Sequence, residues 1–319
     1  MRFKDNFALL VLLGLIVIPG IASAAPFNVG DIFASVGNGQ VQHYNSSLVL
    51  LETLNTGQGG FTTGSVADPS GNFYVTNFSS ASVSKFTGPG DPHTVSIFLN
   101  QGGNPESILF DKSGNVYVSS SSTGVIGKYS STGTPLTTFN TGKGRADWID
   151  LSADQTKMFF TIDVSKGVFV LNLSTSAVTT FNGSVGNFAL RLLSDGGLLV
   201  ANQQDIKRLD SAGNVITTYD APGEDDWFAL NLDPNGSTFW SGDFGTGDFC
   251  QFNISGGAPI VCKNTGTGGN SLFGLSVFGE ITQGGPPTSG VPEPSSLLLL
   301  GAGLLVATRF FRSFTTGHK

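Results

Sequence analysis

The sequence predicts an all-β protein, a six-bladed β-propeller, and an internal repeat is the main observation behind this prediction. One pattern occurs five times: a strand, an Asp/Ser-x-x-Gly turn and a second strand. Asp or Ser at the first turn position can accept backbone hydrogen bonds, and glycine tolerates the left-handed conformation that the turn requires. The residues that open the five turns are Asp68, Asp111, Ser152, Ser194 and Asp233, at steps of 43, 41, 42 and 39 residues.

Two further short β-like stretches follow each of these hairpins. In the second unit they are residues 124–129 and 135–139, and in the fourth unit they are residues 206–209 and 215–219. Four strands in about 42 residues is the period of a propeller blade. That period is far too long for one coil of a β-helix, and a β-sandwich does not repeat internally. Seven blades is the alternative to six.

The two ends of the predicted propeller, residues 26–282, indicate how the ring closes. Residues 31–35, 40–44 and 49–54 have the pattern of the last three strands of a blade, and residues 270–277 match the missing innermost strand. Five complete blades and one blade built from both ends give six. Such closure removes a free sheet edge, which would otherwise promote aggregation.

Composition supports an all-β body and excludes one class of partner. The chain has 44 glycines and 26 phenylalanines among 319 residues, and only 12% of its residues are charged, too few for many amphipathic helices. Its net charge of -7 and the absence of a Lys/Arg cluster between Pro26 and Thr282 argue against nucleic-acid binding.

The N-terminus has the layout of a secretory signal peptide, residues 1–24. Arg2 and Lys4 precede an apolar run, residues 7–18, and small residues follow it. We therefore expect signal peptidase to cleave between Ala24 and Ala25. The alternative is an N-terminal membrane anchor, which the short apolar run and the Ala-Ser-Ala pattern disfavour.

The C-terminus has the layout of a sorting signal, residues 291–315. Pro292, Glu293 and Pro294 form an extended motif, because the two prolines cannot continue a helix. The apolar run 297–307 predicts a short transmembrane helix, and the arginines behind it favour the cytoplasmic side. Residues 283–290, rich in Gly and Pro, are predicted to be a flexible linker. A buried core helix is the alternative for the apolar run.

This terminus resembles the PEP-CTERM signal of exported bacterial proteins. The resemblance implies an exosortase-type enzyme as the processing partner, with the C-terminal helix in the inner membrane before processing. It also implies a final location in the cell envelope or outside the cell. Segments 190–197 and 226–233 of the body look like NHL-type and SMP-30/gluconolactonase-like propeller repeats, and this second resemblance implies the fold alone.

The two cysteines are predicted to form a disulfide. Cys250 and Cys262 lie symmetrically about Gly256, so they would face each other across a turn between two outer strands. Export to an oxidising compartment would preserve the bond. Two free buried thiols are the alternative, and a zinc site is excluded because no histidine lies nearby.

Loops that enter the innermost strands converge at the mouth of a propeller's channel, where ligands usually bind. Carboxylates and amides there could hold a hard cation such as calcium through oxygen ligands. SMP-30-like lactonases have a Glu/Asn/Asp metal site at this location, although that pattern is not matched residue by residue. Turn capping is the alternative role. The candidate mouth residues are Glu106, Asp147, Asn187, Asp226 and Asn270, and the following loops add Asn77, Asp163, Asn202 and Asp243.

Aromatic and histidine residues give weaker signals. Phe61, Trp148 and Trp227 lie near the same loops, where they could stack on sugar rings or, as we favour, pack between blades. His43 and His93 are expected to have ordinary surface or turn roles. The sequence contains no G-x-S-x-G motif, no partners for a serine triad and no phosphate-binding signature in a strand-to-helix setting.

Three functional hypotheses follow from the sequence. The first is an exported, non-enzymatic propeller that binds a polysaccharide or a surface protein, without a cofactor. The second is a metal-dependent, SMP-30-like hydrolase, which needs at least three mouth residues around one ion. The third is a passive structural component of the extracellular matrix.

Overall fold

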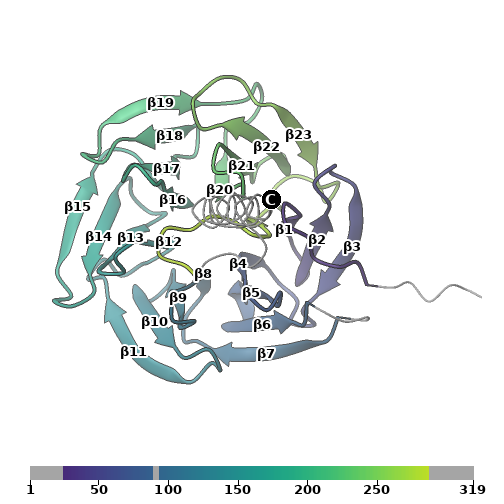
Figure 1. The fold of residues 1–319 in the computed structure, drawn as a ribbon, viewed down its shortest axis with the longest axis horizontal. Helices are drawn as coiled ribbons and strands as arrows, with labels where there is room; N and C mark the ends of the chain where they lie inside the picture. Colours follow the sequence, from purple (N-terminus) through teal and green to yellow (C-terminus); the bar gives the residue numbers. More distant parts are fainter. Residues whose placement is uncertain (1–23, 89–92, 287–319) are drawn as a thin grey trace, which may run out of the picture.

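The computed structural model describes residues 24–88 and 93–286. These residues form six four-stranded antiparallel sheets arranged around a central axis (Figure 1). The predicted six-bladed propeller is therefore confirmed. The predicted signal peptide up to residue 23 and the predicted sorting signal with its transmembrane helix lie outside the described residues.

Each blade is a meander whose first strand lies nearest the axis. Blade 1 is β24 (Gly274–Val277), β1 (Ile32–Ser35), β2 (Gln40–Tyr44) and β3 (Leu50–Asn55); blade 2 is β4 (Thr62–Ala67), β5 (Phe73–Asn77), β6 (Ser82–Phe86) and β7 (Val95–Asn100); blade 3 is β8 (Pro105–Phe110), β9 (Val116–Ser120), β10 (Val125–Tyr129) and β11 (Pro135–Asn140). Blade 4 is β12 (Ile149–Leu151), β13 (Lys157–Thr161), β14 (Val168–Asn172) and β15 (Val178–Asn182); blade 5 is β16 (Leu190–Leu192), β17 (Leu198–Ala201), β18 (Ile206–Leu209) and β19 (Val215–Tyr219); blade 6 is β20 (Trp227–Leu232), β21 (Thr238–Asp243), β22 (Asp248–Asn253) and β23 (Val261–Asn264).

We call the end of the ring where the chain enters each first strand the top, and the end that carries the Asp/Ser turns the bottom. The helix found in the described part of the chain is a single 3-10 turn, η1 (Phe78–Ser80), at the top of blade 2. Within residues 24–88 and 93–286, no helix has the length and apolar character that crossing a membrane requires.

The ring closes as expected, through pairing of its two ends. Strand β24 pairs antiparallel with β1, so that Ile32 lies opposite Val277. The pairing continues past the strands, because the Gly30 nitrogen donates to the Phe278 carbonyl at 2.9 Å. The closing strand is shorter than predicted. Residues 270–273 form a loop instead, in which Asn270 adopts a left-handed conformation with φ of 59°.

The repeated bottom turns explain the period, with two differences from the sequence pattern. In blade 4 the glycine position is held by Gln155, whose φ is 60°. In blade 5 the turn opens at Leu193, not Ser194, because the Gly196 nitrogen donates to the Leu193 carbonyl. The steps between turns thus become 43, 41, 41 and 40 residues, which is more even than the sequence alignment indicated.

Phenylalanine and tyrosine fill the space between neighbouring blades. Phe33 of blade 1 stacks on Phe73 of blade 2 with ring centroids 4.4 Å apart, and Tyr74 meets Phe110 of blade 3 edge-on at 5.2 Å. Buried rings of this size dominate core energetics. Many of the aromatic residues in the sequence therefore stabilise the packing between neighbouring blades.

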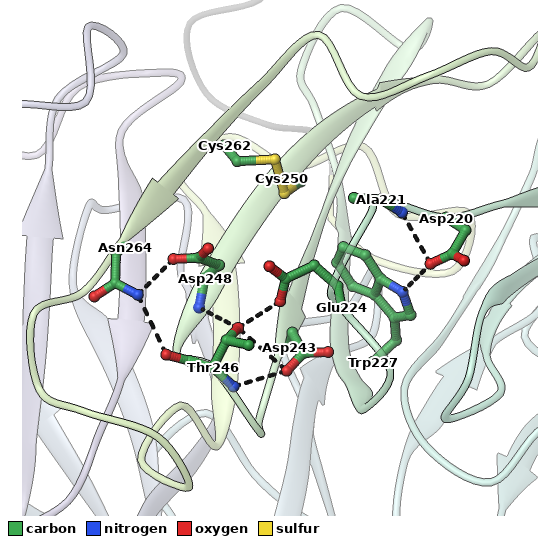
Figure 2. The surroundings of a disulfide bond; sticks show 10 residues. All are labelled: Asp220, Ala221, Glu224, Trp227, Asp243, Thr246, Asp248, Cys250, Cys262 and Asn264. Atoms are coloured by element: carbon green, nitrogen blue, oxygen red, sulfur yellow. Dashed lines mark hydrogen bonds between the residues drawn. A yellow bond between two sulfur atoms is a disulfide. The ribbon is translucent and has the colours of Figure 1, made fainter.

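The cysteines form a disulfide in the outer part of blade 6. Cys250 in β22 lies directly opposite Cys262 in β23, and the two sulfur atoms are 1.98 Å apart. Figure 2 shows the bond beside a group of acidic residues in the top loops of the same blade. Cys250 is fully buried, whereas Cys262 is exposed.

Both described histidines fix the N-terminal segment between blades 1 and 2. His43 is fully buried, with its Nε2 2.9 Å from Asp31 Oδ2 and its Nδ1 3.0 Å from Glu52 Oε1. The His93 ring stacks on Phe27 at 4.3 Å, and its Nε2 is 3.0 Å from the Ala25 carbonyl oxygen. The expectation of surface or turn roles is wrong for His43, which is a core residue.

Candidate binding site at the top of the channel

The five predicted mouth residues all lie at the top of first strands, but their burial differs. Glu106 in β8 and Asp147, just before β12, are buried. Asn187 and Asp226, ahead of β16 and β20, are half-buried, and Asn270 is exposed. The contacts of these side chains divide them, because Glu106 interacts with Asp147 whereas Asp226 interacts with Asp243. The five residues therefore do not converge on one point.

Glu106 and Asp147 form the first acidic group, together with Asp163. The Arg145 guanidinium lies between the two aspartates: its Nη2 donates to Asp147 Oδ1 at 3.3 Å and to Asp163 Oδ2 at 2.6 Å. The Asp163 nitrogen donates to Asp147 Oδ2 at 2.6 Å. Arg145 thus supplies the positive charge that these carboxylates require.

This acidic group holds protons unusually tightly. Burial, and then the charge of Asp147, raise the pKa of Glu106 well above its usual range. Burial and the charge of Asp163 raise the pKa of Asp147 to about 6, although Arg145 opposes the shift. Glu106 Oε2 is buried without a hydrogen-bond partner. The physical cause is the low polarisability of the site, which disfavours the charged form.

Asp226 belongs to a second acidic group, in blade 6. Its backbone nitrogen donates to Asp243 Oδ2 at 2.7 Å, and burial and the Asp243 charge raise its pKa. Figure 2 shows Glu224 and Asp243 around Thr246, whose hydroxyl donates to Glu224 Oε2. Burial, opposed by the hydrogen bond from Thr246, raises the pKa of Glu224 to about 7, and the charges of Asp243 and Asp248 add to the rise.

The split into two groups bears on the predicted cation. In the part of the chain that the structure describes, no three His, Cys, Asp or Glu side chains are placed to hold a metal ion together. Asn187 and Asn270 join neither acidic group.

An arc of aromatic side chains follows the top of the channel beside these carboxylates. It starts at Phe61, which stacks on Phe273 at 4.2 Å; Phe273 meets Phe244 at 5.3 Å. Phe244 meets Phe228 at 6.0 Å, and Phe228 meets Phe188 at 4.7 Å. These five residues, the aromatic arc, connect the entry loops of blades 2, 1, 6 and 5.

The arc remains partly open to solvent. Phe61 is 44% exposed, and Phe188, Phe228 and Phe244 are half-buried. The arc ends where blades 3 and 4 present Glu106, Asp147 and Arg145. The top mouth therefore has an apolar side and an ionic side, a combination that single-residue reasoning missed. The available signal was a phenylalanine within two residues of the start of several first strands.

The two tryptophans near the mouth have structural roles. Trp148 is 1% exposed and packs edge-on against Phe228 at 5.8 Å. Trp227 is fully buried, and its indole nitrogen donates to Asp220 Oδ1 at 3.1 Å, as Figure 2 shows. Of the three aromatic residues singled out in the sequence, only Phe61 is available to a ligand.

Comparison with known proteins supports the sorting signal and the fold. A model of the PEP-CTERM protein-sorting motif matches residues 290–313, which confirms the predicted motif. The motif indicates an exported protein directed to the envelope and implies processing by an exosortase-type enzyme. No curated protein matches the chain at a significant level.

Several solved structures share the propeller. A chain of the crystal structure of a nidogen/laminin complex aligns with a TM-score of 0.64 and 13% identity, covering 77% of this chain and 97% of its own. A functionally unknown protein from Desulfotomaculum acetoxidans DSM 771 aligns at 0.57 and 11%, covering 81% and 99%. A streptogramin B lyase structure aligns at 0.57 and 15%, covering 82% and 89%. At such identities the likeness is one of fold.

Proposed function

We propose that this protein is an exported, non-enzymatic β-propeller that binds a polysaccharide in the cell envelope or extracellular matrix through the top of its channel. The observation that carries the proposal is the aromatic arc, five connected rings of which four stay partly open to solvent beside buried carboxylates. Aromatic rings at a protein surface offer rigid apolar area at low entropic cost.

A carbohydrate chain fits both sides of this mouth. Sugar rings have apolar C–H faces that can stack on phenylalanine rings. Their hydroxyl groups can hydrogen-bond Arg145 and Asp163, whose side chains are 28% and 30% exposed. Phe61 and Phe188 lie at opposite ends of the arc and belong to blades 2 and 5. A ligand that spans the arc therefore contacts several entry loops at once. An extended polymer of sugars meets this requirement better than a single sugar.

The test is binding by the exported protein to a panel of soluble polysaccharides, including the polymer made by the producing cells. Affinity electrophoresis reports retardation in gels that contain each polysaccharide. The double variant Phe61→Ala/Phe188→Ala is expected to weaken binding at least about tenfold, with little change in stability. Val164→Ala is the matched control, because Val164 is 68% exposed on a top loop outside the arc.

Retardation that is equal in the wild type and the arc variant would contradict this proposal. No retardation by any polysaccharide, together with normal cell-surface phenotype of the arc variant, would support the third hypothesis, a passive matrix component. Loss of binding in Val164→Ala as well would show that the contact is nonspecific.

The hydrolase remains a second candidate because of one observation, the proton-holding pair Glu106 and Asp147. A carboxyl group with a raised pKa suits a general acid. Against this candidate, Glu106 is 4% exposed and Arg145 already neutralises its neighbours. Elemental analysis of the purified protein, with lactone and ester assays of Glu106→Gln, tests the metal and the activity separately. A stoichiometric ion that Glu106→Gln loses would favour the hydrolase.

A further inference from the structure

The chain does not leave the propeller when its last strand ends. Residues 278–286, which we call the strap, turn under the bottom of the ring after β24. The Phe278 nitrogen donates to the Asp31 carbonyl at 2.8 Å, and a turn at Gly279, with φ of 82°, redirects the chain. In Figure 1 the yellow end of the coloured chain lies across the middle of the ring.

Glu280 fastens the strap to blades 5 and 6. Its Oε1 accepts hydrogen bonds from Arg191 Nε at 2.8 Å and from the Leu232 nitrogen at 2.7 Å, and its Oε2 accepts from Asn231 Nδ2 at 2.7 Å. These donors belong to blades 5 and 6, whereas the strap continues from blade 1. The Glu280 and Arg191 side chains are only 9% and 8% exposed.

Such a pair resists opening. Removing one partner of a buried ion pair leaves the other as an uncompensated charge, which is strongly unfavourable. Arg191 is also held near Asp150, because Asp150 Oδ2 accepts from the Leu192 nitrogen, next to Arg191, at 2.7 Å. The strap is therefore bound by a largely buried contact that satisfies both Glu280 oxygens at the bottom of the channel.

The strap then passes under blades 4, 3 and 2. Gly284 is buried against Leu151, and a Cβ added at residue 284 would lie 2.6 Å from that side chain and its carbonyl oxygen. Only glycine allows so close an approach. Pro286 lines a bottom cavity together with Val66 and Phe110. The chain thus leaves the described region from beneath the ring, not from its rim.

We propose that the strap is a latch that holds the sorting signal close beneath the bottom face, so that this face is part of the surface met by the processing enzyme. Five residues lie between Pro286 and Pro292, so the six steps along the chain reach at most about 20 Å. With the latch open, the free chain starts at Phe278, and its reach grows to about 50 Å. The latch therefore sets the distance at which a membrane-bound exosortase-type enzyme meets the propeller.

The first experiment measures the latch in the purified exported protein by hydrogen exchange. Glu280→Gln removes the charge that pairs with Arg191, and Gly284→Val displaces the strap from Leu151 without touching that pair. We expect amides of residues 278–285 to exchange at least about tenfold faster in both variants, with the strands of blades 2 to 5 unchanged. Asp195→Asn is the matched control, because it removes a carboxylate from the exposed bottom ion pair with Arg208. Unchanged exchange in both strap variants would overturn the latch.

The second experiment measures processing of the full chain in the producing cells by pulse-chase labelling. Glu280→Gln and an eight-residue Gly/Ser insertion after residue 288 both lengthen the free tether. We expect each to slow processing several-fold, because a longer tether lowers the effective concentration of the bottom face at the enzyme. The insertion leaves the propeller intact, so it gives the answer even if Glu280→Gln does not fold. Unchanged or faster processing with the insertion would overturn the role assigned to the bottom face.

Discussion

At the top and at the bottom of this propeller, an arginine lies beside two carboxylates, but the two arginines differ in exposure. At the top, Arg145 lies between Asp147 and Asp163, and its side chain is 28% exposed. At the bottom, Arg191 contacts Glu280 beside Asp150, and it is 8% exposed. The difference is the strap, which covers the bottom arginine and its carboxylates. Among the described residues, no segment covers Arg145 in the same way.

This comparison shows that the chain itself covers the bottom of the ring, whereas the top of the ring stays partly exposed. At the bottom, the partner of the arginine comes from the chain itself, and backbone and amide donors satisfy every Glu280 oxygen. At the top, the carboxylates are arranged but the aromatic arc beside them stays partly open. The end that the protein completes internally is structural, and the end that it leaves incomplete is where we place the ligand.

The largest test of this contrast replaces each arginine with methionine. Arg191→Met should lower the free energy of unfolding by about 3–5 kcal/mol, because it leaves Glu280 and Asp150 buried without a cation. Arg145→Met should cost only about 1–2 kcal/mol, since its site is partly solvated and Asp147 can take up a proton. Urea denaturation of both variants measures the difference. Equal losses would show that the two ends are not energetically distinct.

The disulfide tests whether the top of blade 6 depends on its outer strands. The double variant Cys250→Ala/Cys262→Ala should lose about 2–3 kcal/mol of unfolding free energy, because the short loop between the cysteines is no longer closed in the unfolded chain. Hydrogen exchange of the strap should stay at its wild-type rate. Wild-type protein treated with a reductant is the control. Full stability of the double variant would mean that strand pairing alone holds this edge.

The protonated carboxyls at the top predict an unusual pH dependence. The pKa of Glu106 is raised in the folded protein, so the unfolded chain loses this proton first, at about pH 4. The stability that the proton supplies is complete below that pH and is lost as the pH rises through the folded pKa. Glu106→Gln, which mimics the protonated acid, should match the wild type at pH 4 and exceed it at pH 8.

The control for this pH test is Asp154, an exposed carboxylate at the bottom whose pKa is lowered and not raised. Hydrogen bonds from Ser152 and Thr156 lower the pKa of Asp154 to about 2. Its contribution is therefore complete above about pH 4 and is lost only as the pH falls towards 2, so Asp154→Asn should be less stable than the wild type by a constant amount across pH 4–8. Urea midpoints of both variants across pH 4–8 give the comparison. A stability gain of Glu106→Gln at pH 4 would contradict the assigned protonation.

The smallest expected effect on stability is at the arc. Phe61→Ala should change the free energy of unfolding by at most about 1 kcal/mol, because the ring is 44% exposed. Thermal denaturation measures this change, and affinity electrophoresis measures the effect on binding. A large loss of stability would show that Phe61 belongs to the core and would weaken its assignment to the ligand site.

Periodic features of the sequence predicted the fold. Contacts that join different blades could not be predicted from it. The turns at Asp68, Asp111 and Asp233 and the closing strand before Val277 were visible because each carries its own local pattern. Glu280 carried no such pattern. Its partners Arg191 and Asn231 lie in other blades, and only the closed ring brings them together.

The candidate site was predicted only in part. The sequence placed Glu106, Asp147 and Asp226 at the top of first strands, where the structure has them. It predicted their convergence from entry position alone. In a ring of six blades, entry position fixes the height of a residue but not the neighbour that it reaches, so two separate acidic groups formed. The arc escaped notice because the phenylalanines that form it are indistinguishable in sequence from those between the blades.

The pairing of β24 with β1 also orders events during synthesis. Ile32 is made early in synthesis, yet its partner Val277 is made close to the end. The first blade therefore cannot complete its sheet until almost the whole chain has been synthesised. The sorting motif at residues 290–313 follows directly behind the closing strand. Completion of the first blade and synthesis of the sorting motif therefore follow each other closely at the end of the chain.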